Sequence, residues 1–354
     1  MSWLLPPLPP TFDAALRDVR ARGFEARLAA AERLADPEPG RESEALDGLI
    51  VMSRDLNGRV RAAALRGLDG HEDLRVTDLL IAALEDGEPL VREVAVVGLG
   101  SVDSERARQA LIEALGSDHA EVRFQAIESY LEAAGEPQLG AIAPLLSDTD
   151  ARVRENAALN LHRLGEAARE PLREALDDPS PRVRQRAAIS LGTLGDSAAV
   201  PALCEALGDP ELLVAALDLL GGLGEPRAVA PVAAIATAFL KPLPLKVAAA
   251  RALCRLGDPR GLAALFSVLR ALRGDGRSYA VEVIGELGLQ ELAGELLRLS
   301  RRLRGTDPVT LVEALIALGP GSEPARSALQ TLARRRDPAG ERAREALGDE
   351  PEKP

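Results

Sequence analysis

The chain has 354 residues, of which 46% are hydrophobic but only 2% are aromatic, and its formal net charge is −12. A core with so few rings must be built from Leu, Ala, Val and Ile, which favours closely packed helices and predicts an all-α fold. The negative charge argues against a nucleic-acid partner, because binding to phosphates begins with a positive protein surface.

The N-terminal segment begins Met1-Ser-Trp-Leu-Leu-Pro-Pro-Leu-Pro-Pro10. It lacks the basic residues and the apolar run of a secretory signal, and its prolines prevent a helix. A weak match to the repeat described below starts at Ala26-Arg27. We therefore expect residues 1–44 to form a Pro-rich segment followed by capping helices.

A Val-Arg pair recurs after this segment at steps of 31, 31, 31 and 30 residues. Such a fixed period predicts one small unit stacked many times. With Val as position 0, the apolar positions 4, 8 and 11 fall within about 80° of one another on a helix, and so form one buried stripe. The pairs are Val60-Arg61, Val91-Arg92, Val122-Arg123, Val153-Arg154 and Val183-Arg184.

A glycine occupies position 12 in the later units, where a residue in the left-handed conformation would end the helix. These glycines also reveal units whose Val-Arg pair has changed, as far as the unit that starts at Asp307. The count reaches about ten units. The glycines are Gly165, Gly195, Gly224, Gly257, Gly288 and Gly319.

Each unit also contains an earlier helix, so that it consists of helix A, a turn, helix B and a stop. Asn57, Asp150 and Ser180 suit the N-cap of helix B. We expect the repeats to fill residues 45–340, and residues 341–354 to form a C-terminal cap with a charged tail. The clearest A helices are expected at Thr77 to Leu84, Arg106 to Leu115, Ala168 to Leu176, Ala199 to Leu207, Leu262 to Leu272 and Pro324 to Arg335.

The pattern Asp148…Val153-Arg154…Leu161…Leu164-Gly165 resembles the HEAT-like repeats of the phycobilin lyase (PBS lyase) type, over roughly residues 45–335. The resemblance implies a right-handed α-solenoid whose A helices line the convex side and whose B helices line the concave side. It also implies a ladder of ion pairs between turn aspartates and helix-B arginines. Asp55, Asp86, Asp148 and Asp178 would meet Arg61, Arg92, Arg154 and Arg184, or the equivalent arginines of neighbouring units.

Catalytic sites find little support in the sequence. HEAT-like di-iron hydroxylases use several His-Glu pairs, whereas this chain has His71-Glu72 alone, and its other histidines, His119 and His162, occupy different repeat positions. Three metal ligands are therefore not expected to converge. We expect no metal, no cofactor and no enzyme activity, although the resemblance keeps a lyase acting on a tetrapyrrole as an alternative.

The compartment is expected to be the cytoplasm. Cys204 and Cys254 lie inside helical patterns, which supports neither a disulfide framework nor a cysteine metal site. The most apolar stretch, residues 231–240, is followed by Pro242 and Pro244 before it could span a bilayer. We expect no membrane partner.

Recognition is expected where the repeats differ, at the exposed positions 2, 3, 6, 9 and 10 of the B helices. The leading hypothesis is a bacterial-type, non-catalytic protein-binding scaffold or regulatory adaptor. The alternative is an enzyme or lyase-type subunit acting on a bound protein or tetrapyrrole. Packing between repeats is the competing interpretation for the aromatic candidates. The partner-binding candidates are Phe124, Glu128, Glu155, Asn156, Arg163, Arg186, Arg251, Tyr279 and Glu282.

The charge is unevenly distributed. Residues 1–240 contain 24 Arg or Lys and 40 Asp or Glu, whereas residues 241–345 contain 18 and 12. The basic end would fit an acidic protein surface, and it permits a weak head-to-tail self-association with the acidic part of another copy. A solvated surface is the alternative. The basic clusters are Arg298, Arg301, Arg302 and Arg304, and Arg334 to Arg336.

Overall fold

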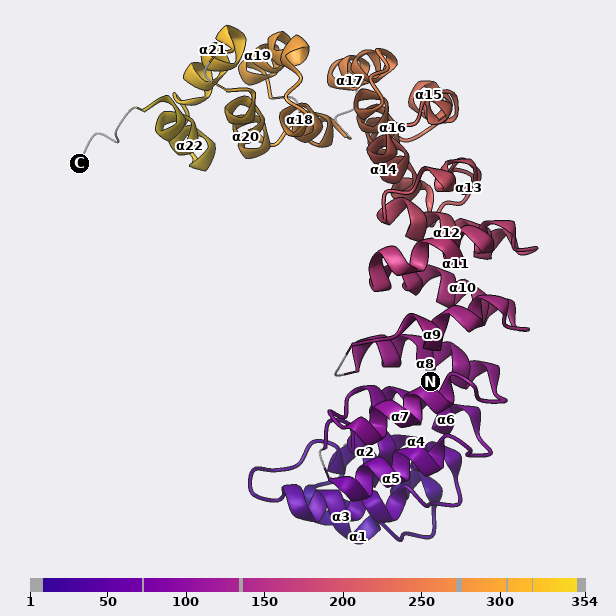
Figure 1. Cartoon of the computed structure of the whole chain (residues 1–354). Helices are drawn as coiled ribbons and strands as arrows, with labels where there is room; N and C mark the ends of the chain where they lie inside the picture. The colour runs from indigo at the N-terminus through magenta and orange to yellow at the C-terminus, as the bar shows by residue number, and fades with distance from the viewer. Residues whose placement is uncertain are drawn as a thin grey trace, which may run out of the picture. The chain divides into compact units, whose positions relative to one another are not determined.

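The computed structural model describes residues 9–71, 73–133, 136–271, 276–303, 305–319 and 321–348. Within these ranges all regular secondary structure is helical, and Figure 1 traces it from α1 to α22. The all-α prediction is confirmed. The first eight residues of the expected Pro-rich segment and the last six of the expected tail lie outside the described residues.

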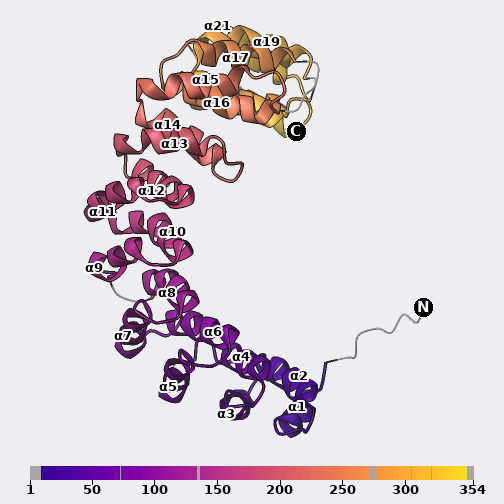
Figure 2. The ribbon, with the colours of Figure 1, turned by 90° about the vertical axis from the view of Figure 1, so that its right-hand side faces the viewer.

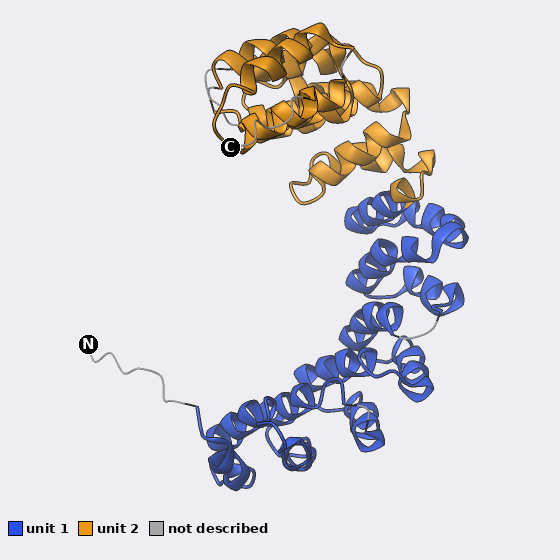
Figure 3. Cartoon of the chain, turned by 90° about the vertical axis from the view of Figure 1, so that its left-hand side faces the viewer, with its two compact units in different colours: residues 1–190 blue, residues 191–354 orange. Residues whose placement is uncertain are grey.

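The chain divides into two compact units, Met1–Ser190 and Leu191–Pro354, which Figure 3 colours separately. Each unit is a stack of helical hairpins, and helix α12 (Pro181–Thr193) contains the boundary. The expected segment boundaries near residues 44 and 340 stay predictions.

In the first unit, Figure 2 shows α3, α5 and α7 in one layer and α4, α6 and α8 in the other; α6 packs against α4 and α8, and α5 packs against α7. We call the second layer the helix-B layer. The hairpins, helix A before helix B, are α1 (Phe12–Asp18) with α2 (Phe24–Leu34), α3 (Glu42–Met52) with α4 (Gly58–Gly67), α5 (Leu74–Ala83) with α6 (Pro89–Gly100), α7 (Glu105–Ala114) with α8 (Ala120–Glu132), α9 (Leu139–Ile142) and the 3-10 helix η1 (Ala143–Ser147) with α10 (Ala151–Asn160), and η2 (Leu161–Ala168), α11 (Arg169–Glu174) and η3 (Ala175–Asp177) with α12.

The second unit continues the same alternation. Its described residues form five hairpins, which follow the six described in the first unit, in line with the expected count of about ten repeats. They are η4 (Ser197–Ala199) and α13 (Val200–Ala206) with α14 (Leu213–Leu223), η5 (Pro226–Ala228) and α15 (Val229–Thr237) with α16 (Leu243–Arg255), α17 (Arg260–Arg270) with α18 (Arg277–Glu286), η6 (Gln290–Leu292) and α19 (Ala293–Arg301) with α20 (Pro308–Leu318), and α21 (Glu323–Leu332) with α22 (Pro338–Leu347).

The periodic apolar positions form the core, as the sequence predicts. The five valines of the Val-Arg pairs are fully buried, and so are the alanines four residues later. Position 8 is a buried Leu in four of these units and Tyr130 in the third, where the phenol oxygen accepts the N–H of Gln138 at 3.0 Å. Tyr130 can therefore replace Leu, because its polar end has a hydrogen-bond partner.

The helix boundaries also follow the predicted signals. All six position-12 glycines have positive φ, between 63° and 81°, which confirms them as stops. Asn57 and Asp150 accept the N–H groups of Arg59 and Arg152, as N-caps do. The helix expected over residues 168–176 is divided between α11 and η3.

The expected ladder is present in the first unit, and one rung shows its geometry. Arg61 donates from Nε and Nη2 to the carboxylate of Asp86, at 2.7 and 2.6 Å, and Asp86 belongs to the next turn. Its Nη1 donates to the carbonyl oxygen of Asp55 at 2.8 Å, in the turn of its own unit. One guanidinium therefore joins two successive turns.

The same rung recurs along the unit. Each of these aspartates contacts two arginines, because its carboxylate binds the arginine of the preceding unit while its carbonyl binds that of its own unit. Of the two predicted pairings, the structure confirms the second: each carboxylate pairs with the arginine of the neighbouring unit and not with that of its own unit. The rungs are Arg27 with Asp55, Arg61 with Asp86, Arg123 with Asp148, and Arg154 with Asp178.

The ladder changes at the turn between α7 and α8, where Ser117 occupies the position of the aspartate. Arg92 instead pairs with Glu121, on the helix that follows the turn. The Ser117 hydroxyl still accepts the N–H of His119 at 3.2 Å, which keeps the turn closed. The ion pair is therefore retained although its acidic partner has moved along the sequence.

Removing one ladder carboxylate should strongly destabilise the first unit. The side chains of Arg123 and Asp148 are only 13% and 6% exposed, so Asp148→Ala leaves a nearly buried guanidinium without its carboxylate. We expect a loss of about 3 kcal/mol in urea denaturation. Arg152→Ala is the control, because Arg152 is 74% exposed in its pair with Asp150 and should cost less than about 1 kcal/mol. Equal losses in the two variants would contradict a structural ladder.

The ladder should also make stability depend on pH. The hydrogen bond from Arg123 holds the pKa of Asp148 below its ordinary value of 3.8. The unfolded chain therefore takes up this proton first as the pH falls, and the stabilisation, complete above roughly pH 4, is lost as the pH falls through the lowered folded-state pKa. Urea denaturation between pH 7 and pH 3 should show a smaller loss of stability in Asp148→Asn than in wild type. Identical pH profiles would refute this.

Candidate functional site

An apolar groove lies on the helix-B layer of the first unit. Leu90 and Val97 of α6 are each 45% exposed, and Phe124 of α8 is 40% exposed. Two adjacent hollows of about 270 Å³ each share Glu93 and Gln125 and together hold these three apolar side chains. Other lining residues are Leu65, Arg66, Asp69, Val94, Gly98, Ala120, Glu121, Arg152 and Val153.

The apolar groove is lined by more acidic than basic side chains, namely Asp69, Glu93 and Glu121 against Arg66 and Arg152. The carboxylates of Asp69, Glu93 and Glu128 form no hydrogen bond or ion pair with any residue that the structure describes. The surrounding unit is acidic as well, since residues 1–190 contain 23 Arg or Lys and 34 Asp or Glu. Of the predicted candidates, Phe124 and Glu128 therefore lie together, exposed, on one helix.

Asn156 is not exposed, so the prediction of a solvent-facing side chain is wrong at this position. The residue is 9% exposed, and its Nδ2 donates to the carbonyl of Phe124 at 2.8 Å. Its Oδ1 accepts from Asn160 at 2.9 Å. Asn156 is turned toward the neighbouring helix α8, and its amide ties α10 to it.

Three other candidates in this unit also make contacts between helices. Glu155 accepts from Nε of Arg186 at 3.2 Å, and Arg163 donates to the carbonyl of Leu131 at 3.3 Å. The sequence did not indicate Ser190, whose buried hydroxyl donates to the carbonyl of Ala158 at 2.6 Å. Only its place, a polar residue in an otherwise apolar stretch of helix, could have pointed to it.

The candidates in the second unit form a charged cluster. Arg251 forms ion pairs with Asp218 and with Glu286, the latter at 3.4 Å. Its guanidinium lies 5.9 Å from the ring centre of Tyr279, whose pKa is raised by burial. Glu282 is exposed on the same helix as Tyr279. Arg251 and Tyr279 are therefore brought together.

Asp218 and Glu286 are the members of this cluster that the sequence analysis missed. Asp218 and Arg251 both stand at position 6 of their units, so opposite charges at one repeat position were an available signal. Glu286 stands at position 10, like Arg255, with which it also forms an ion pair. Every residue of the cluster except Glu282 contacts another residue of the cluster. These contacts hold α14, α16 and α18 together.

Two sequence predictions concern absences. Within the described ranges, no group of three or more His, Cys, Asp or Glu side chains could hold a metal ion, and Glu72 of the His71-Glu72 pair lies outside them. No helix in the described part of the chain is long and apolar enough to cross a membrane.

The burial of Asn156 leads to a prediction about stability. Asn156→Ala removes the hydrogen bond from Nδ2 to the carbonyl of Phe124, so we expect the free energy of unfolding to fall by about 1–2 kcal/mol. Glu128→Ala, at an exposed side chain without a described partner, should change it by less than about 0.5 kcal/mol. Thermal and urea unfolding of both variants measure the difference. A stable Asn156→Ala protein would show that the amide does not tie the helices.

Comparison with protein families matches the HEAT-repeat model to residues 46–131 and 139–214. The model of the PBS lyase HEAT-like repeat matches residues 245–270. No curated protein sequence matches the chain.

Solved structures resemble it in fold. Importin beta has a TM-score of 0.52 at 16% identity, over 95% of this chain and 49% of its own, so the present chain spans about half of importin beta. Escherichia coli YibA gives 0.45 at 19% identity, over 85% and 99%. The complex of CpcE and CpcF of phycocyanin lyase from Nostoc sp. gives 0.34 at 24% identity, over 72% and 92%.

The period, the buried valines, the glycine stops and the matched family models all describe the same repeat. The chain belongs to the HEAT-repeat family, and its residues 245–270 match a repeat of the PBS lyase HEAT-like type.

Proposed function

We propose that the protein is a non-catalytic scaffold that binds a partner protein in the apolar groove of the first unit. The observation that carries the proposal is the exposure of Leu90 and Val97 in one hollow and of Phe124 in the adjacent one. Single exposed apolar side chains are normal, whereas a contiguous apolar patch with a polar border is typical of a protein-binding site.

The occupant that fits best is a basic amphipathic helix of the partner. Its apolar face would cover Val97 and Phe124, in the way that helices dock into grooves elsewhere. Its Lys and Arg side chains would meet Asp69, Glu93 and Glu128, whose carboxylates have no described partner. This charge complementarity would speed association and select basic partners over acidic ones.

The chemistry of the remaining side chains supports binding over catalysis. Polar groups such as Asn156, Ser190 and Arg186 are engaged between helices. Burial raises the pKa of the Cys254 thiol to about 11, which disfavours the reactive thiolate. Cys204 and Cys254 form no disulfide, which agrees with our proposal of a reducing, cytoplasmic location.

A matched pair of variants tests the proposed groove. Val97→Asp places a charge in it, whereas Val51→Asp makes the same change at a valine that is 42% exposed on the A helix α3. In affinity capture from a lysate of the source cells, quantified by mass spectrometry, Val97→Asp should lose at least about 90% of the partner, equivalent to about 1.4 kcal/mol. Val51→Asp should retain it.

The location of the interface and the absence of catalysis are tested separately. Equal capture by both variants would place the interface outside the groove. A partner whose mass is changed after incubation with the protein would instead support the alternative, an enzyme or lyase-type subunit that acts on a bound protein.

A further inference from the structure

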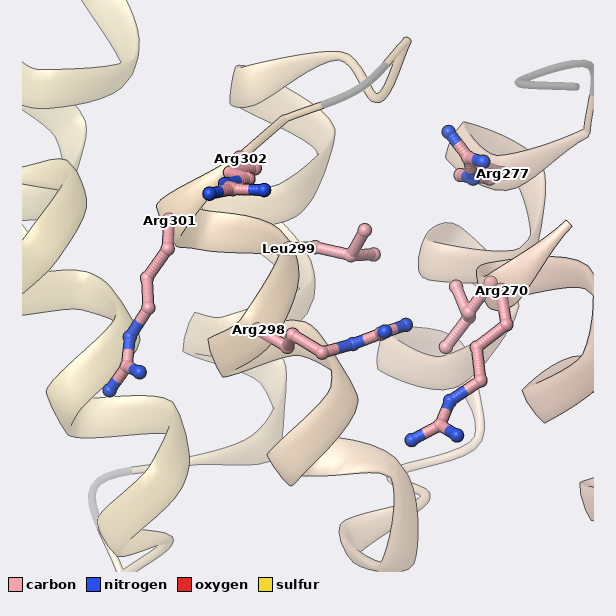
Figure 4. Close-up of a pocket in the computed structure, with 7 residues that line it drawn as sticks. Arg270, Arg277, Arg298, Leu299, Arg301 and Arg302 are labelled. Carbon is pink, nitrogen blue, oxygen red and sulfur yellow. The ribbon is translucent and has the colours of Figure 1, made fainter. Parts of the chain in front are cut away.

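A cavity lined by arginines lies in the second unit, among α17, α18 and α19. Its volume is about 270 Å³, and the charged residues among its described lining are all arginines. In Figure 4, Arg298 points toward Arg270, Arg277 and Arg302 lie on opposite sides, Leu299 lies between them, and Arg301 is turned away. The full lining is Leu269, Arg270, Arg277, Arg298, Leu299, Arg301 and Arg302.

Among the residues that the structure describes here, the guanidinium groups outnumber the acid beside them. Glu295 forms ion pairs with both Arg270 and Arg298, at 2.6 and 2.8 Å. The Arg302 side chain has no hydrogen bond or ion pair with another described residue. Arg277 is 4% exposed and donates to the carbonyl of Ala271. Arginine does not lose its proton in proteins, so this excess of positive charge cannot be relieved by deprotonation.

We propose that this arginine cavity binds a phosphate group. One carboxylate would add a single negative charge, as Glu295 already does. A phosphate monoester carries a charge of about −1.5 to −2 on three acceptor oxygens of one small group, so several guanidinium groups can bind it together. The planar forks of Arg298, Arg270 and Arg302 suit such contacts.

The cavity also has room for the part of the ligand that carries the phosphate. Its volume is several times the roughly 30 Å³ that one water occupies in the liquid. Leu269 and Leu299 offer apolar surface at the same place. The ligand is therefore a phosphorylated small molecule or a phosphorylated side chain. The site does not depend on the apolar groove, which lies in the other unit.

Calorimetric titration of the full chain tests the proposal with two probes. Inorganic pyrophosphate represents a free phosphate ligand. A peptide whose only charged side chain is one phosphoserine represents a modified protein, and the same peptide with serine is the blank. Wild type should bind pyrophosphate or the phosphopeptide saturably at one site, and the tighter probe identifies the source. Arg302→Glu should weaken this binding at least about tenfold, which equals about 1.4 kcal/mol.

Arg334→Glu is the matched control, because Arg334 is an exposed arginine in the same unit that does not line the cavity. It should change the affinity less than about twofold, which equals about 0.4 kcal/mol. Arg302→Gln removes the charge without reversing it, and it should also weaken binding if Arg302→Glu unfolds. The absence of saturable binding of both probes, equal effects of Arg302→Glu and Arg334→Glu, or saturable binding of the plain serine peptide as tight as that of the phosphopeptide would each overturn the proposal.

Discussion

The two-way bridge made by each ladder arginine is the constraint on which the first unit depends. Arg61 holds a carbonyl oxygen of its own turn and both carboxylate oxygens of the next turn, so the position of one hairpin fixes the next. The charges are largely buried, and breaking one rung leaves an unpaired ion, which is costlier than the net value of the pair. Valines and alanines can then pack as a nearly uniform stripe, because the polar ladder sets the register.

Because the ladder sets the register and the apolar stripe forms the core, the less regular positions remain for recognition. The ladder and the buried stripe occupy the same repeat positions in successive units, whereas Val97 and Phe124 are exposed, and Glu93 and Glu128 have no described partner. The two units provide different chemistry. The groove of the first combines apolar and acidic groups, and the cavity of the second gathers guanidinium groups that include Arg298. A scaffold with both features could hold a basic segment and a phosphorylated ligand at separate places.

The sequence predicted the repeat well and its contacts less well. The burial of Val60 and its equivalents, and the backbone conformation of glycines such as Gly224, are set within one hairpin. The local sequence pattern therefore predicts both. Asn156 was misjudged because a helical wheel gives the direction of a side chain but not what faces it on the neighbouring helix. For the same reason the ladder partner of Arg92 and the grouping of Arg270 with Arg298, which lie on different helices, could not be read from spacing.

The stability of the first unit depends most directly on energetic coupling between successive turns. A double-mutant cycle at Arg61 and Asp86, with each residue changed to Ala singly and together, measures that coupling in urea denaturation. A ladder that fixes the register predicts a coupling energy of about 2 kcal/mol, with the double variant less destabilised than the sum of the single variants. Additivity of the two single changes to within about 0.5 kcal/mol would contradict it.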